Sequence, residues 1–284
     1  MTIRINTGFN RRDVIIYSLG VGAVELPFTY ENHESFRPIP TILFSLTLKG
    51  DATDTQPFPP PFFPPDEVAI RGPVLDGERY LELYRPLRET ESLEMETVTV
   101  AIARKGSGAI VQSETTFRDQ EGQLVGRIFS GTFYAGSRDC DERGELRLFT
   151  RPVPADRQPD RVIEEHVLPQ LPAIYRLSGD YNPLHIDPEF ASTFSFPKPI
   201  MHGLCTLGFA VRIIIRELMK NDAAAVKRVA CRFSKPSYPD TVLRVEIWQT
   251  SRGVVSFRVI DRGTGSIVVD HAYVEFEPVN SSKL

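Results

Sequence analysis

The chain has 284 residues, 41% of them hydrophobic and 25% charged, which is typical of a globular protein of about two domains. Its net charge of −4 argues against nucleic-acid binding through an overall positive field. No stretch approaches the roughly 18 consecutive apolar residues of a membrane-spanning helix, and three cysteines do not make a disulfide framework.

The first half of the chain predicts two helical segments followed by an antiparallel meander. Residues 16–19 belong to a short helix, and residues 41–48 are the candidate for a buried helix. Three segments rich in β-branched and aromatic residues then alternate with turn sequences, as in strands joined by hairpins. These predicted strands are Leu93–Arg104, Ala109–Arg118 and Leu124–Ala135.

Six prolines occupy the nine positions 57–65, between the predicted helices and strands. Proline lacks a backbone donor, so this run cannot be a helix or a central strand. A proline-rich docking motif is one interpretation. We favour a stiff loop over the sheet or at the rim of a pocket, because its three phenylalanines require apolar cover.

The second half repeats the order of the first, with turns offset by about 145 residues, one domain length. Residues 203–219 are apolar on nearly all sides, which suits a helix enclosed by a sheet. A meander follows, with predicted strands Val242–Thr250, Val254–Ile260 and Ser266–Phe276.

A long helix gripped by a curled antiparallel sheet is the hotdog architecture, and two such halves predict an α+β double hotdog. The segment between the halves mixes charge, Pro and Gly with little periodicity. The predicted parts are a degenerate N-terminal hotdog at 1–138, a linker at 139–159, a catalytic C-terminal hotdog at 160–280 and a tail at 281–284.

A turn in the second half carries the strongest chemical signal. Asp180 and His185 are separated by Pro183, and this proline, with Ser178-Gly179, disfavours a helix through the segment. We therefore predict a tight turn over residues 178–185 that directs a carboxylate and an imidazole at one point. Such a pair can exchange protons with a water molecule, as water addition requires.

The start of the long helix is the second chemical feature. The first N–H groups of a helix lack partners, and Gly203 has no side chain to keep a substrate carbonyl away from its own N–H. We therefore predict an oxyanion-binding amide at Gly203. His185, His202 and Cys205 do not have the spacing of a zinc site, so we predict no metal and no other cofactor.

The segment from Tyr175 to Gly208 contains Ser-Gly-Asp-x-Asn-Pro-Leu-His and then Pro-Ile-Met-His-Gly-Leu. It resembles the (R)-specific 2-enoyl-CoA hydratases, the MaoC-like hydratase 2 family, and likeness to the peroxisomal members extends over nearly the whole chain. The resemblance implies a double hotdog with one active site, in the C-terminal half. It also implies addition of water to trans-2-enoyl-CoA to give (3R)-3-hydroxyacyl-CoA in fatty-acid β-oxidation.

The resemblance further implies roles for single residues. Asp180 and His185 match the catalytic pair, Asn182 the residue that orients them, and Gly203 the donor to the thioester oxygen. Glu31 matches a first-half glutamate that is important in the peroxisomal enzymes. The positions that match acyl-CoA contacts are Asp76, Gly77, Lys105, Asp180, Tyr181, Asn182, Pro183, Leu184, His185, Gly203 and Phe233. Animal members carry histidine in place of Asp76, which is a departure of this chain from their pattern.

Ser282-Lys283-Leu284 is the signal that the peroxisomal import receptor reads, so we predict a peroxisomal protein and that receptor as a partner. Two other functions stay open. A hotdog thioesterase would cleave the same acyl-CoA, and a non-catalytic acyl-CoA binder would not need Asp180 and His185 on one turn. The sequence also leaves a homodimer open.

Overall fold

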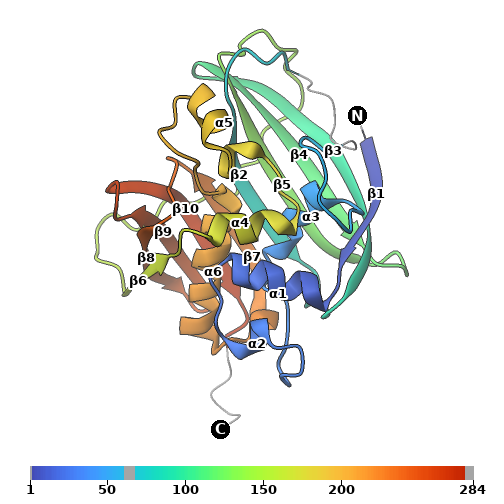
Figure 1. Cartoon of the computed structure of the whole chain (residues 1–284), viewed down its shortest axis with the longest axis vertical. Coiled ribbons are helices and arrows are strands. Elements are labelled where there is room, and N and C mark those ends of the chain that lie inside the picture. Colours follow the sequence, from blue (N-terminus) through green and yellow to red (C-terminus); the bar gives the residue numbers. More distant parts are fainter. Residues whose placement is uncertain (1, 61–67, 279–284) are drawn as a thin grey trace.

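The structure, a computed structural model, describes residues 2–60 and 68–278 (Figure 1). Part of the proline-rich run and the predicted tail at 281–284 lie outside these residues. The described strands form one ten-stranded antiparallel sheet. Its strands are β1 (Thr2–Phe9), β2 (Val74–Leu83), β3 (Glu91–Lys105), β4 (Gly108–Arg118), β5 (Leu124–Ala135), β6 (Arg161–Val167), β7 (Val226–Phe233), β8 (Thr241–Ser251), β9 (Val254–Asp261) and β10 (Ser266–Phe276).

The two halves order their strands in the same way. From the outer edge inward, the first half reads β1-β3-β4-β5-β2 and the second reads β6-β8-β9-β10-β7. The halves meet where β2 pairs with β7, which makes one continuous sheet of two equivalent parts. This repeated order confirms the predicted double hotdog.

The six predicted meander strands are all present, and β5 and β10 have the predicted ends. The sequence does not predict β1, β2, β6 or β7. These strands pair with partners that no short turn joins to them, so they lack the hairpin signal that identified the others.

The helices lie against one side of the curved sheet (Figure 1). The predicted helix at 203–219 is α6 (Gly203–Met219), and the first-half candidate is the shorter α3 (Ile42–Lys49). The other helices are α1 (Arg11–Gly20), α2 (Leu26–Thr29), α4 (Leu171–Tyr175) and α5 (Pro188–Thr193), with 3-10 turns η1 (Arg176–Ser178), η2 (Pro183–His185) and η3 (Ala223–Ala225).

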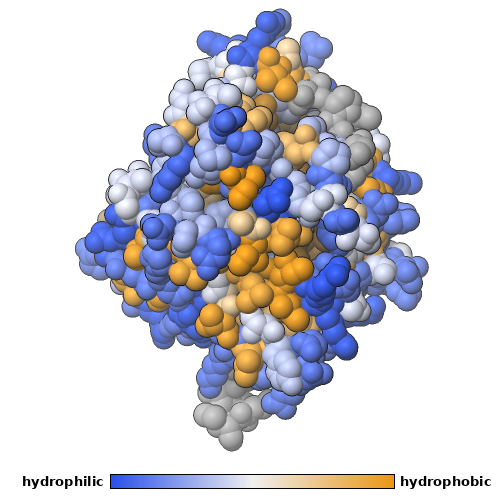
Figure 2. Space-filling model, viewed as in Figure 1, coloured by the Kyte–Doolittle hydropathy of each residue, from blue (hydrophilic) through white to orange (hydrophobic). Residues whose placement is uncertain are grey.

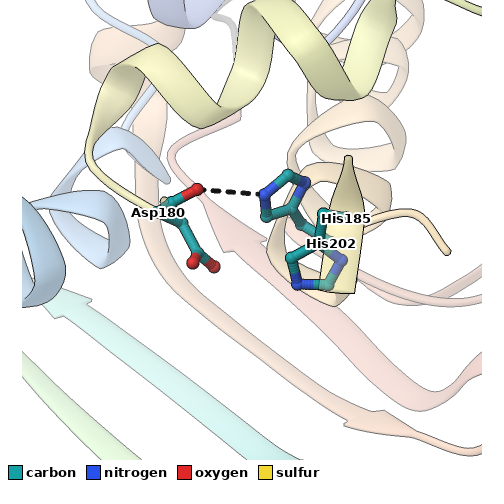
Figure 3. A group of neighbouring side chains, drawn as sticks. All are labelled: Asp180, His185 and His202. Atoms are coloured by element: carbon teal, nitrogen blue, oxygen red, sulfur yellow. Dashed lines mark hydrogen bonds between the residues drawn. The ribbon is translucent and has the colours of Figure 1, made fainter. Parts of the chain in front are cut away.

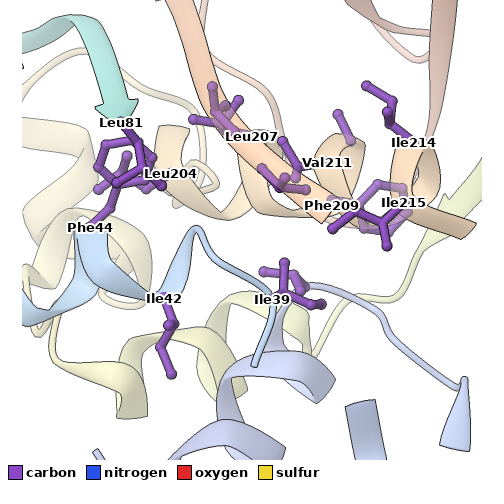
Figure 4. Packing of buried hydrophobic residues seen from close by; sticks show 14 of the residues in the cluster. Ile39, Ile42, Phe44, Leu81, Leu204, Leu207, Phe209, Val211, Ile214 and Ile215 are labelled. Carbon is purple, nitrogen blue, oxygen red and sulfur yellow. The ribbon is translucent and has the colours of Figure 1, made fainter. Parts of the chain in front are cut away.

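One cluster of buried apolar side chains spans both halves around α6. Figure 4 shows Leu204 of α6 beside Phe44 and Leu81 of the first half, and all three side chains are buried. Each such side chain contributes roughly 1.5–3 kcal/mol when it is fully buried. Gly208 allows α6 to approach α1 closely, because a Cβ there would lie 2.6 Å from Val21.

Apolar side chains also gather on the outer surface of the helix-covered face (Figure 2). Exposed large apolar side chains on or next to the helices are Leu19 of α1, Val24, Leu26 of α2 and Leu177 of η1. Patches of this kind occur where proteins contact other molecules.

No helix in the described part of the chain has the length and apolar character needed to cross a bilayer.

Arg212 of α6 ties the halves together electrostatically. Its side chain is only 1% exposed, and its guanidinium bonds Glu165 of β6 and lies 3.1 Å from Glu25, which precedes α2. Without Arg212, the Glu25 side chain, which is 9% exposed, would keep only the 3.5 Å contact with Arg216 as an ion pair among the described residues. Loss of one member of a buried ion pair typically costs about 3–5 kcal/mol.

We therefore expect Arg212→Met to lower the free energy of unfolding by about 3–5 kcal/mol in denaturant titrations. The matched control is Arg161→Met, which removes a 51%-exposed arginine that lies 3.4 Å from Glu217. We expect less than about 1 kcal/mol from this control. Equal losses in the two variants would contradict a structural role for the buried pairs.

Candidate active site

A cavity of about 650 Å³ opens where the two halves meet, a size that accommodates a substantial organic ligand. The first half contributes the start of β2, the β3–β4 hairpin and residues near the end of β5. The second half contributes the turn at 180–185, the start of α6 and the end of β7. Both halves are therefore needed to form the site.

The turn predicted at 178–185 is present and is fixed by its own side chains. Gly179 has φ 131°, and a Cβ there would lie 2.6 Å from Lys49, so the backbone passes close to α3. Asp180 Oδ1 accepts a hydrogen bond from the Asn182 N–H at 3.2 Å. Asn182 Oδ1 in turn accepts from the Leu184 N–H at 3.0 Å, so Asn182 caps η2.

His185 is held in one tautomer by the backbone. Its Nδ1 lies 2.9 Å from the Ile200 carbonyl oxygen, which can only accept, so Nδ1 carries the proton in this bond. Burial lowers the pKa of His185, and the Asp180 carboxylate opposes that shift. The neutral ring therefore keeps Nε2 as an acceptor. Figure 3 shows the ring and the Asp180 carboxylate close together.

Gly203 begins α6 in the cavity wall, where the first helical amides have no partner within the helix. A Cβ at this position would lie 3.1 Å from the Phe233 ring and would crowd the space beside the Gly203 N–H. Glycine leaves that space free for a ligand carbonyl. The partial positive charge of the helix start favours a developing negative charge on a bound carbonyl.

Asp76 enters the cavity through a β-bulge. The register of β2 against β5 shifts between Asp76 and Glu78, and a Cβ on Gly77 would lie 2.8 Å from the Gly131 carbonyl oxygen. The Asp76 carboxylate pairs with Arg79 at 2.9 Å. Burial raises the pKa of Asp76, Arg79 opposes the rise, and the nearby charge of Asp180 adds to it.

The cavity wall also carries basic side chains from both halves. Lys105 comes from the β3–β4 hairpin, Arg147 from the segment between β5 and β6, and Arg232 and Lys235 from the end of β7. These charges can meet an anionic ligand locally although the chain is acidic overall.

The structure brings most of the predicted site residues together. Asp76, Gly77, Lys105, Asp180, Asn182, Leu184, His185, Gly203 and Phe233 all line the cavity. Tyr181 and Pro183 belong to the same turn but are outside the cavity wall as described; the Arg176 guanidinium lies 4.9 Å from the Tyr181 ring. Their predicted roles as acyl-CoA contacts stay predictions.

Glu31 is placed elsewhere. It is exposed after α2, it accepts a hydrogen bond from neighbouring Asn32 at 3.2 Å, and it is not among the described residues that line the cavity. Its catalytic role stays a prediction that the geometry does not support directly.

Sequence reasoning missed Arg79 and His202. Arg79 has no local signal, because the bulge that places it depends on pairing with β5. His202 could have been found from its place directly before Gly203. Asp180, His185 and His202 have potential metal-ligating atoms within 4.8 Å of one another. However, one ring nitrogen of each histidine bonds a backbone carbonyl, which leaves a sparse ligand set.

Two family models match this chain. Residues 8–136 match the MFE-2 hydratase 2 N-terminal domain, and residues 151–271 match the MaoC like domain. The peroxisomal multifunctional enzyme type 2 of Drosophila melanogaster is 36% identical over 95% of this chain, which spans only 46% of that enzyme. The chain thus covers less than half of that relative's length.

Two other similar proteins match nearly end to end. The peroxisomal enoyl-CoA hydratase 2 of Arabidopsis thaliana is 33% identical, with 96% of this chain and 92% of the plant protein covered. The crystal structure of a MaoC-like dehydratase from Phytophthora capsici superposes with a TM-score of 0.93 and 34% identity, covering 100% of this chain and 97% of that one.

Proposed function

This chain belongs to the hydratase 2 family of MaoC-like dehydratases, and we propose that it adds water reversibly to trans-2-enoyl-CoA to give (3R)-3-hydroxyacyl-CoA. One observation about the geometry of the site supports this proposal most strongly. The Asp180 carboxylate and the neutral His185 ring meet in one cavity beside the first amide of α6.

The reaction needs an electron-poor alkene and an oriented water. The thioester oxygen accepts a hydrogen bond from the Gly203 N–H, which stabilises the negative charge that develops there. Asp180 takes a proton from the water as its oxygen bonds the β-carbon, and His185 Nε2 holds the same water as an acceptor. The proton held by Asp180 is then delivered to the α-carbon with the help of His185, so the product gains the hydroxyl at the β-carbon and the hydrogen at the α-carbon.

The cavity wall suits the two ends of an acyl-CoA. Lys105, Arg147, Arg232 and Lys235 offer positive charge to the CoA phosphates. An acyl chain would contact the apolar side chains of Leu48, Phe58, Leu184, Phe196 and Ile200.

The test is incubation of the purified protein with trans-2-decenoyl-CoA. We expect loss of the enoyl absorbance, no release of free thiol, and a 3-hydroxyacyl-CoA of (R) configuration. An (S) product would contradict the family mechanism. Thiol release would favour the thioesterase, and binding without turnover would favour a non-catalytic binder.

We also propose a peroxisomal location, which is supported by the names of the Drosophila and Arabidopsis relatives. Recognition of Ser282-Lys283-Leu284 by the import receptor belongs to this proposal, and those residues lie outside the described part of the chain. A fusion with a fluorescent protein at the N-terminus tests it. Unchanged peroxisomal signal after removal of these three residues would contradict the receptor's role.

A further inference from the structure

His202 lies directly behind the proposed catalytic residues, in contact with Asp180 and His185, and it is not among the described residues that line the cavity. It is the residue directly before Gly203, and it is 1% exposed. Residues at this position of a helix usually accept a hydrogen bond from the first amides. In the described structure the His202 side chain makes no such bond, and Figure 3 shows it turned toward Asp180 instead.

One ring nitrogen of His202 bonds the backbone of the predicted base. Nε2 lies 3.2 Å from the Asp180 carbonyl oxygen, which can only accept, so Nε2 carries the proton. Nδ1 is then an acceptor, and it is buried with no hydrogen-bond partner among the described residues. An unpaired buried nitrogen is unfavourable for stability, so stability alone gives no reason for histidine here.

The ring also packs against the predicted acid–base partner. The centroids of His202 and His185 are 3.8 Å apart with 31° between the ring planes, and Tyr175 lies 4.9 Å away. The titratable and charged groups around His202 are Asp180, His185, Tyr175 and Arg176. Burial holds the pKa of His202 well below its usual value, and positive charge on Arg176, or on His185 when that ring is protonated, lowers it further. The ring therefore stays neutral beside His185.

We infer that His202 is a positioning residue that fixes the Asp180 backbone, the plane of the His185 ring and the adjacent Gly203 amide relative to one another. This inference rests on the proposed hydration. In this inference one side chain, that of His202, holds all three groups in place, although they come from the turn and from the start of α6. Displacement of reacting groups by about 1 Å can cost about 100-fold in rate, so the contact is worth a measurable share of kcat.

Three substitutions separate the two contacts of the ring. His202→Gln keeps an N–H donor at the reach of Nε2 and loses the ring, whereas His202→Phe keeps a ring and loses the donor. His202→Ala loses both. We expect kcat to fall about 100-fold in the alanine variant and about 10-fold in each of the others, with KM changed less than about 3-fold. The control is His166→Gln, an exposed histidine paired with Asp240, which should keep full activity.

A second readout does not depend on activity. The pKa of His185, followed by NMR, should rise toward its ordinary value in His202→Ala, because water replaces the packed ring. An unchanged His185 pKa, or full kcat in both the glutamine and phenylalanine variants, would overturn the inference. Equal loss of kcat and gain of KM would also overturn it. If the unsubstituted protein does not hydrate the substrate, the proposed function fails, while the NMR result still decides whether His202 positions His185.

Discussion

Asp180→Asn is expected to lower kcat for hydration of trans-2-decenoyl-CoA by about 10³–10⁴-fold. The substitution keeps the shape of the turn, because an amide oxygen can still accept the Asn182 N–H as the carboxylate does at 3.2 Å. It removes the basic group that we propose takes a proton from water. The expected loss is therefore chemical, and KM should change little. Initial rates from the enoyl absorbance, with circular dichroism as the check on folding, measure the effect.

Asp187→Asn is the matched control for this variant. Asp187 lies two residues beyond His185, is exposed, and caps α5 by accepting from the Glu189 and Phe190 N–H groups. Asparagine caps helices about as well as aspartate, so stability and kcat should both be retained. Near-normal hydration by Asp180→Asn would remove Asp180 as the base and leave its place in the cavity to binding alone.

The turn at Asp180 and His185 could be predicted because its causes are local. Pro183 disfavours an α-helix through Asn182, and Gly179 supplies the positive φ. The ends of α6 could also be predicted from the sequence, because the apolar run over these residues indicates a helix that is buried on nearly all sides. Hairpin turns set β5 and β10 in the same way.

Asp76 marks where local reasoning stops. Its entry into the cavity depends on a bulge, in which Asp76 and Glu78 pair with successive residues of β5 and Gly77 is left as the extra residue. The residues next to Asp76 in the sequence predict neither the register of β2 against β5 nor the ion pair between Asp76 and Arg79. Glu31 is the opposite case. Its resemblance to a family position suggests a role, whereas the structure places it in an exposed turn. Local motifs suggest candidate residues here, and tertiary placement decides which of them line the cavity.

The second large effect concerns His185 and the pH profile. In the proposed mechanism an unprotonated Nε2 holds the water, because Nδ1 is committed to the Ile200 carbonyl oxygen at 2.9 Å. Burial lowers the pKa of His185, so the neutral form persists below the ordinary value of about 6.5. We therefore expect kcat/KM to hold steady as pH falls through about 6.5 and to decline only at lower pH, where His185 takes up a proton.

His185→Gln tests this assignment directly. Glutamine can occupy the space but cannot exchange a proton near neutral pH, so kcat should fall by about 10²–10⁴-fold. The decline of kcat/KM on the acid side that belongs to His185 should disappear with the ring. Profiles between about pH 5 and pH 8, for this variant and the unsubstituted protein, provide the comparison. If the variant keeps both the rate and the same acid-side decline, the decline belongs to another group. The neutral His185 ring would then be a wall of the cavity and not a partner of the water, and the acid–base work would fall to Asp180 alone.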